Sequence, residues 1–130
     1  MTFDGLEGDN TQIQIGEISE DVVRILSLPI QAGTPIYLGK SNLVHMQNSH
    51  PRDFRKYGSR LARIISEPDY IGIRRDGTIE YIKAYGMHIK VAVRVSLVGE
   101  YFARTLYHVD ANAAKRLISS KAWVSAKVID

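Results

Sequence analysis

Histidines and basic residues crowd one stretch of the chain, SNLVHMQNSHPRDFRKYGSRLARII (41–65). This stretch holds His45 and His50, two of the four histidines, with Pro51 directly behind them. Histidine is the side chain best suited to proton transfer near neutral pH, and cations bind the negative charge of a phosphate. A helix that starts at Pro51 would therefore begin beside two proton-transfer groups. Its basic residues are Arg52, Arg55, Lys56, Arg60 and Arg63.

A second set of polar groups follows the strand pattern HIKVAVRVSLVG (88–99). Side chains alternate across a strand, so Lys90, Arg94 and Ser96 share one face and the opposite face is aliphatic. Helices pack on the aliphatic face of such a sheet, which leaves the polar face open. The alternative is an ordinary solvated face with cross-strand polar pairs. Depending on register, neighbouring strands add further groups to the polar face: Lys83, Arg104, Thr105, Tyr107 and His108.

These groups match the chemistry of cutting an RNA phosphodiester at its 2′-hydroxyl. That reaction needs a base for the hydroxyl proton, an acid for the leaving oxygen and positive charge on the phosphorane. His45 and His50, with the basic helix and the cationic sheet face, supply these roles without a metal. The alternative is that His50 only shapes the start of the helix and that His45 is a partly buried structural residue. The predicted substrate-binding residues are Lys40, Arg52, Lys83, Lys90, Arg94 and Ser96.

Several other kinds of site are excluded or disfavoured. The chain has no cysteine, so it has no disulfide, no thiolate nucleophile and no zinc–cysteine site. A metal site is disfavoured because Asp53 is the only carboxylate close to the two histidines. The sequence contains no P-loop, no dinucleotide-binding fingerprint and no nucleophile elbow. The prediction is therefore a site without metal or cofactor.

The composition is that of a soluble globular chain with an uneven charge distribution. Its 130 residues, 45% hydrophobic and 24% charged, predict a single domain over residues 1–130, with residues 1–10 flexible. No apolar run approaches the roughly 20 residues of a membrane span, and the acidic start does not resemble a signal peptide. Residues 1–21 contain no lysine or arginine, so residues 22–130 hold all 17 basic residues against 8 acidic ones, a balance of +9. Such a body attracts polyanions, although a generic basic surface is the alternative.

The periodicity predicts an α+β fold, with N-terminal helices packed on a four-stranded antiparallel β-meander and a short C-terminal helix. Helices are expected over 19–28, from Ser41 or Pro51 to about 65, and from 110 to 120, with Ser19 and Asp110 as N-caps. The meander is expected over 70–75, 79–85, 88–99 and 101–109. Short strands are expected over 11–18 and 33–40, and Trp123 should pack the tail down.

Residues 35–110 resemble the phage-associated nuclease-like domains of the barnase–EndoU–colicin–RelE (BECR) class. In those domains a helix with histidine leads to a Pro-Asp step, a meander of strands and a last strand with a Thr-x-Tyr-like pattern. The matching pieces in this sequence are His45 and His50, Pro68-Asp69, and Thr105-Leu106-Tyr107.

The resemblance implies a metal-independent ribonuclease, often a toxin or a phage-borne effector. His45 or His50 would be the general base or acid, and Arg104, Thr105 and Tyr107 would position or stabilise the phosphate. The implied partners are RNA, with tRNA as one candidate, and a cognate antitoxin or immunity protein. The implied location is the cytoplasm, or a target cell or phage particle that receives the protein.

The leading hypothesis from the sequence is a small endoribonuclease that cuts by 2′-hydroxyl attack and leaves a 2′,3′-cyclic phosphate. One alternative is a non-catalytic RNA-binding or phage structural adaptor domain of the same fold. Another is an interaction module, bound to an antitoxin or self-associating, whose basic face meets an acidic protein.

Overall fold

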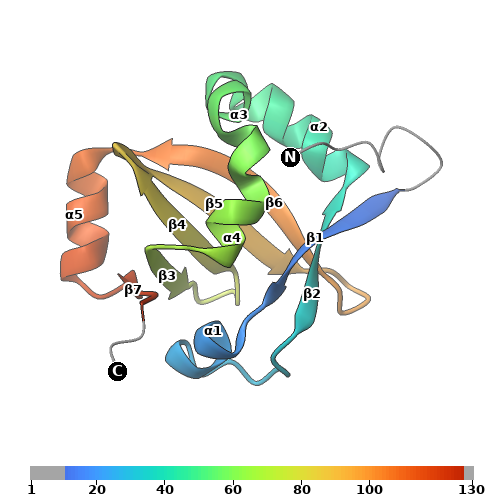
Figure 1. The fold of residues 1–130 in the computed structure, drawn as a ribbon, viewed down its shortest axis with the longest axis horizontal. Helices are drawn as coiled ribbons and strands as arrows, with labels where there is room; N and C mark the ends of the chain where they lie inside the picture. Colours follow the sequence, from blue (N-terminus) through green and yellow to red (C-terminus); the bar gives the residue numbers. More distant parts are fainter. Residues whose placement is uncertain (1–10, 128–130) are drawn as a thin grey trace.

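The fold is α+β, as predicted, and is built on one mixed sheet of seven strands (Figure 1). A computed structural model describes residues 11–127. The predicted flexibility of residues 1–10 lies outside this range. The order across the sheet is β1-β2-β6-β5-β4-β3-β7. The strands are β1 (Gln12–Ile18), β2 (Thr34–Gly39), β3 (Tyr70–Ile73), β4 (Ile79–Tyr85), β5 (Met87–Val95), β6 (Tyr101–Val109) and β7 (Val124–Ser125).

The predicted four-stranded meander is only the centre of this sheet. Strands β3 to β6 pair antiparallel in chain order, as the alternating pattern indicates. The prediction missed that β1 and β2 extend the same sheet, with β2 parallel to β6 through Ile36↔Tyr101 and Tyr37↔Phe102. It also missed β7, which pairs with β3 next to the buried Trp123. The sheet is therefore larger than predicted because two of its pairings join segments far apart in the sequence.

The helix expected to run from Pro51 to about residue 65 is broken into three parts. They are α3 (Pro51–Tyr57), a 3₁₀ turn η2 (Gly58–Arg60) and α4 (Leu61–Ser66). Gly58 lies against the ring of Phe54, where an added Cβ would come within 3.0 Å of that ring. A helix therefore cannot carry an ordinary side chain at this point without shifting Phe54. Because of this break, α3 and α4 are separate helices, and α4 crosses the face of the sheet (Figure 1).

The main core lies between α4 and the aliphatic face of the sheet. Leu61, Ile64 and Ile65 of α4 belong to the same buried cluster as Val91 and Val93 of β5. Val95, expected on the same face, is the last residue of β5 and is 46% exposed. The aliphatic face thus carries the fold's main hydrophobic stabilisation.

The remaining helices are α1 (Glu20–Ile25), α2 (Lys40–Ser49) and α5 (Ala111–Ser119). The predicted N-caps are confirmed: Ser19 Oγ accepts a hydrogen bond from the backbone of Val22, and Asp110 accepts one from Ala113. Helix α1 ends before Pro29, which was expected to close it, because Ser27 takes a left-handed conformation with φ 53°. None of the helices within residues 11–127 is long and apolar enough to cross a membrane.

Helix α5 covers one end of the second face of the sheet. A small second cluster there joins Ile82 of β4, Ala114 of α5 and Trp123. Ile82 lies directly opposite Lys90, so this cluster shares its face with the polar side chains of β5. The rest of that face is left uncovered by α5.

Candidate active site

A groove of about 470 Å³ lies on the polar face of the sheet beside α2. Helix α2 continues directly from β2 and runs against β6 (Figure 1). Its residues Ser41, Asn42 and His45 form one wall of the groove. Strands β5 and β6 form the floor, and the β3–β4 turn closes one end. The lining residues are Ser41, Asn42, His45, Arg74, Asp76, Thr78, Lys90, Ala92, Arg94, Arg104, Thr105 and Tyr107.

A β-bulge in β6 shapes the floor. Thr105 pairs with Ala92, but the next pair on the other side is Ala103 with Val93, so Arg104 is an extra residue in β6. A bulge breaks the strict alternation of side chains and re-aims one of them. As a result, the consecutive residues Arg104 and Thr105 both line the groove instead of pointing to opposite faces.

The groove carries an excess of positive charge. Arg74, Lys90, Arg94 and Arg104 line it, against the single carboxylate of Asp76. The Arg94–Asp76 pair is long, at 3.9 Å, and both side chains are about half exposed, so solvent screens their attraction. The pair therefore leaves most of the charge of Arg94 available to an anion.

Arg104 has a buried donor ready for a ligand. Its Nε is buried and has no hydrogen-bond partner within the part of the chain that the structure describes. A buried donor left unpaired costs about 1–3 kcal/mol.

Lys90 is held beneath the groove by a buried ion pair. Its Nζ lies 2.9 Å from Oε2 of Glu80, and the two side chains are only 9% and 11% exposed. Trp123 donates its indole N–H to the other oxygen of Glu80, at 3.3 Å. Burial lowers the pKa of Lys90, but hydrogen bonds to Tyr107 and Glu80 and the charge of Glu80 outweigh burial and raise that pKa. The ammonium is therefore fixed and charged.

Tyr107 lies between Lys90 and His50. The Lys90 Nζ is 4.6 Å from the centroid of the Tyr107 ring, and the His50 ring stacks on the same tyrosine with centroids 4.8 Å apart and an interplanar angle of 26°. His50 does not line the groove. Its contact with Tyr107 makes it a support for that ring.

His45 lines the groove from α2, whereas Lys90, Arg94 and Arg104 line it from the strands of its floor. His45 is exposed on α2, one turn after Ser41, which also lines the groove. The Oγ of Ser49, one turn further along, lies 3.2 Å from His45 Nδ1. The imidazole lines the same groove as Arg104, Thr105 and Tyr107.

Comparison with known families gives a match over residues 13–116. The matching model is described as phage-Barnase-EndoU-ColicinE5/D-RelE like nuclease 3. The chain belongs to this family of nuclease-like domains. The predicted resemblance is thereby confirmed, over a longer range than the 35–110 expected. Neither the curated proteins nor the solved structures that were compared with the chain gave a match.

In this nuclease domain, the groove unites most but not all of the predicted site residues. His45, Arg104, Thr105, Tyr107, Lys90 and Arg94 line it. Lys40 and Arg52 are exposed on α2 and α3 and do not line it. The hydroxyl of Ser96 accepts a hydrogen bond from the backbone of Glu100 in the β5–β6 turn, at 3.2 Å.

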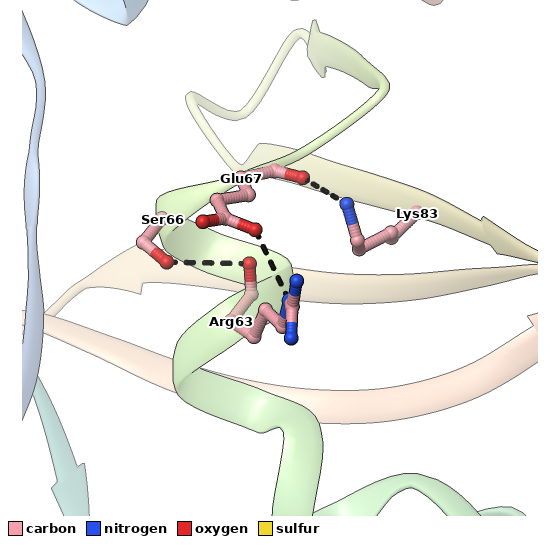
Figure 2. A network of polar contacts seen from close by, with 4 residues as sticks. All are labelled: Arg63, Ser66, Glu67 and Lys83. Carbon is pink, nitrogen blue, oxygen red and sulfur yellow. Dashed lines mark hydrogen bonds and ion pairs between the residues drawn. The ribbon is translucent and has the colours of Figure 1, made fainter.

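Lys83 lies on the other face of the sheet. It pairs with the buried Ile89, and its Nζ donates to the backbone carbonyl of Glu67 at 2.6 Å. Figure 2 shows this contact beside the Arg63–Glu67 ion pair and the Ser66 hydroxyl at the end of α4. Lys83 therefore lies on the helix side of the sheet, where it binds the end of α4, and not in the groove.

Besides Ser41 and Ala92, four lining residues were not predicted as site residues: Asn42, Arg74, Asp76 and Thr78. Asn42 caps the start of α2 by accepting a hydrogen bond from the backbone of Gly39 at 3.0 Å. The other three belong to the RRDGT turn, which the sequence marks as a hairpin turn but not as a wall of a site. The two arginines of this turn, together with the cationic pattern of the strand 88–99, were the signal in the sequence that could have indicated a role in the site. No group of three or more His, Asp or Glu suited to a metal occurs within residues 11–127.

Asp53 ties α3 to the end of β6, behind His50 and Tyr107. Its carboxylate accepts hydrogen bonds from the backbone N–H of His108 at 3.0 Å and from His108 Nδ1 at 2.9 Å. Burial raises the pKa of Asp53, but the hydrogen bonds from His108 outweigh burial and lower it below its usual value. His108, predicted as a candidate for the polar face, instead lies opposite Ile89 on the helix side.

Replacing Asp53 with alanine is expected to lower the free energy of unfolding by about 1–2 kcal/mol at pH 7, since the His108 ring is half exposed. A carboxylate whose pKa is lowered by folding stabilises the protein above its unfolded pKa. That contribution is lost as the pH falls through the folded pKa. The difference between wild type and Asp53→Ala should therefore narrow below about pH 4 in urea unfolding. Asp53→Asn keeps one acceptor and should lose less of the free energy of unfolding. Equal stability of all three proteins would contradict a stabilising role for the hydrogen bonds between Asp53 and His108.

Proposed function

We propose that this nuclease domain is a metal-independent endoribonuclease that cuts RNA by attack of the 2′-hydroxyl. The observation that supports this most directly is the groove, which is lined by one imidazole, one tyrosine and several cations. His45 stands on one wall and Tyr107, Lys90, Arg94 and Arg104 on the floor. These are the proton-transfer and charge-stabilising groups that the reaction requires.

In the proposed reaction His45 accepts the proton of the 2′-hydroxyl, and the freed oxygen attacks the adjacent phosphorus. The bond from phosphorus to the 5′-oxygen of the next nucleotide then breaks. That oxygen takes a proton from the hydroxyl of Tyr107. Tyr107 then recovers a proton from solvent, with the Lys90 ammonium beside it, and His45 releases the proton that it accepted to solvent. The products are a 2′,3′-cyclic phosphate and a 5′-hydroxyl.

The cations act on the negative charge of the phosphorane. Arg104 contributes an unpaired buried Nε, and Thr105 adds a hydroxyl beside it. Lys90 is already desolvated and fixed by Glu80, so no energy is spent to order it during the reaction. Arg94 and Arg74 are less constrained and suit the neighbouring phosphates of the strand.

The proposal extends to the partners of the domain. The basic body over residues 22–130 would attract RNA, tRNA included, and the same surface would suit an acidic antitoxin or immunity protein. The absence of cysteine fits a reducing compartment such as the cytoplasm.

A single 2′-deoxy nucleotide at the cut site should abolish cleavage there, because the attacking oxygen is then missing. Cleavage of the all-ribose strand should persist in EDTA and leave a cyclic phosphate, which mass spectrometry of the fragments detects. Cutting of the 2′-deoxy position, or complete loss of activity in EDTA, would contradict the mechanism. RNA binding with no cutting under any condition would favour the non-catalytic adaptor.

A further inference from the structure

An aromatic pair lies beside the groove, where β2 meets β6. Tyr37 and Phe102 are register partners in the parallel pairing of these strands, and their ring centroids are 5.9 Å apart at an angle of 44°. Phe102 also lies directly opposite Arg94 of β5, whose side chain lines the groove. Directly opposite residues place their Cβ atoms about 4.5–5.5 Å apart on one face of a sheet. The pair therefore continues the floor of the groove towards β2.

These two rings do not serve the hydrophobic core. Tyr101, next to Phe102, packs against the main core, whereas Phe102 and Tyr37 belong to neither buried cluster of the described residues. Both remain partly exposed. Aromatic side chains outside a core, on the open face of a sheet, are available to a ligand.

The wall of the groove is continuous with the pair. Helix α2 begins after Gly39, and a Cβ at Gly39 would lie 3.0 Å from Oδ1 of Asn42 and 3.7 Å from the Phe102 ring. Asn42 lines the groove, and the Phe102 ring lies close to the same glycine. A strand whose phosphate occupies the groove would thus bring its neighbouring base to the rings.

We propose that Tyr37 and Phe102 form a stacking site for the unpaired base next to the cleaved phosphate. This inference rests on the proposed ribonuclease function and names its substrate class, a single-stranded RNA segment. A base in a duplex is stacked inside the helix, whereas an unpaired base can stack on an aromatic ring. Such stacking tolerates every base, because each has a π-face, so the site would select single strands without selecting a sequence.

The experiment is a double-mutant cycle between the protein and the RNA. A short single-stranded RNA with one cut site is compared with two copies that carry an abasic residue on either side of that site. Each is cleaved by wild type, Phe102→Leu and Phe102→Tyr. Stacking of one base is worth about 5–150-fold in affinity, so Phe102→Leu should raise KM by that factor and change kcat little. Phe102→Tyr should restore the KM.

The cycle separates stacking from a general loss of structure. One of the two abasic substitutions should raise the KM of wild type as much as Phe102→Leu does, and it should add little more in that variant. Leu97→Ala, at the fully exposed tip of the same hairpin, is the matched control and should behave as wild type. Two outcomes would overturn the stacking site. In the first, the increases in KM caused by the abasic residue and by Phe102→Leu multiply in full when the two are combined. In the second, Phe102→Leu leaves KM unchanged.

Failure of the proposed function gives a different pattern. A wild type that never cuts would refute the ribonuclease, and the same cycle is then read from affinity, as fluorescence anisotropy of labelled RNA. If the losses of affinity caused by Phe102→Leu and by one abasic residue are not independent, the stacking site is supported. If they are independent, the stacking site is refuted.

Discussion

Replacing His45 with alanine is expected to lower the rate of RNA cleavage by about 10²–10⁴-fold, the usual contribution of one positioned proton-transfer group. The side chain is exposed on α2, so its removal leaves no cavity and should not unfold the domain. The measurement is kcat for a single-site RNA with wild type and variant, together with a thermal unfolding curve for each.

The matched control is Gln47→Ala, an exposed residue of the same helix that does not line the groove. It should keep the wild-type rate. The wild-type rate should also fall on acidification, because a protonated imidazole accepts no proton, and the His45→Ala variant should lose this acidic limb. A folded His45→Ala protein at full activity would rule out His45 as the base.

The same test separates the two histidines of the segment 41–65. His50 stacks on Tyr107 from outside the groove, so it has no direct path to the substrate hydroxyl. His50→Ala should therefore slow cleavage less than His45→Ala, and His50→Phe should restore much of the loss by keeping a ring against Tyr107. The sequence left these roles open, and the proposal assigns the base to His45 because His45 lines the groove and His50 does not.

The parts of the site that the sequence predicted are those that local periodicity controls. Alternation along 88–99 placed Lys90 and Arg94 on the face away from Val91 and Val93, and the structure has them so. Capping residues and turn glycines predicted element boundaries for the same local reason. The α+β class followed from signals of this kind, whereas the family followed from the resemblance of short motifs over residues 35–110.

The parts that the sequence could not show depend on contacts between distant segments. The bulge at Arg104 arises between two strands and has no signature in either one. The parallel pairing of β2 with β6 places α2 beside the groove, and no local sequence pattern predicts this pairing. Lys83 resembled a member of the polar face until the register with Ile89 placed it on the other side.

Breaking the Glu80–Lys90 pair is expected to have the largest effect on stability. Removing one partner of a buried ion pair leaves an uncompensated charge and costs about 3–5 kcal/mol. Lys90→Met should therefore lower the free energy of unfolding by an amount of this order, measured in urea at pH 7. The wild-type advantage should be full below about pH 10.4, the ordinary pKa of lysine, because the pKa of Lys90 is raised by folding. It should decline as the pH rises through that higher value.

The double variant Glu80→Gln with Lys90→Met separates stability from catalysis. It removes both charges, keeps an acceptor for the indole N–H of Trp123 and fills the space of the lysine, so most of the lost stability should return. Cleavage should stay slow, because no ammonium then lies against Tyr107. A double variant that is stable and fully active would show that Lys90 only supports the fold. One as unstable as Lys90→Met would show that the cost lies in packing, since the unpaired charge of Glu80 is then absent.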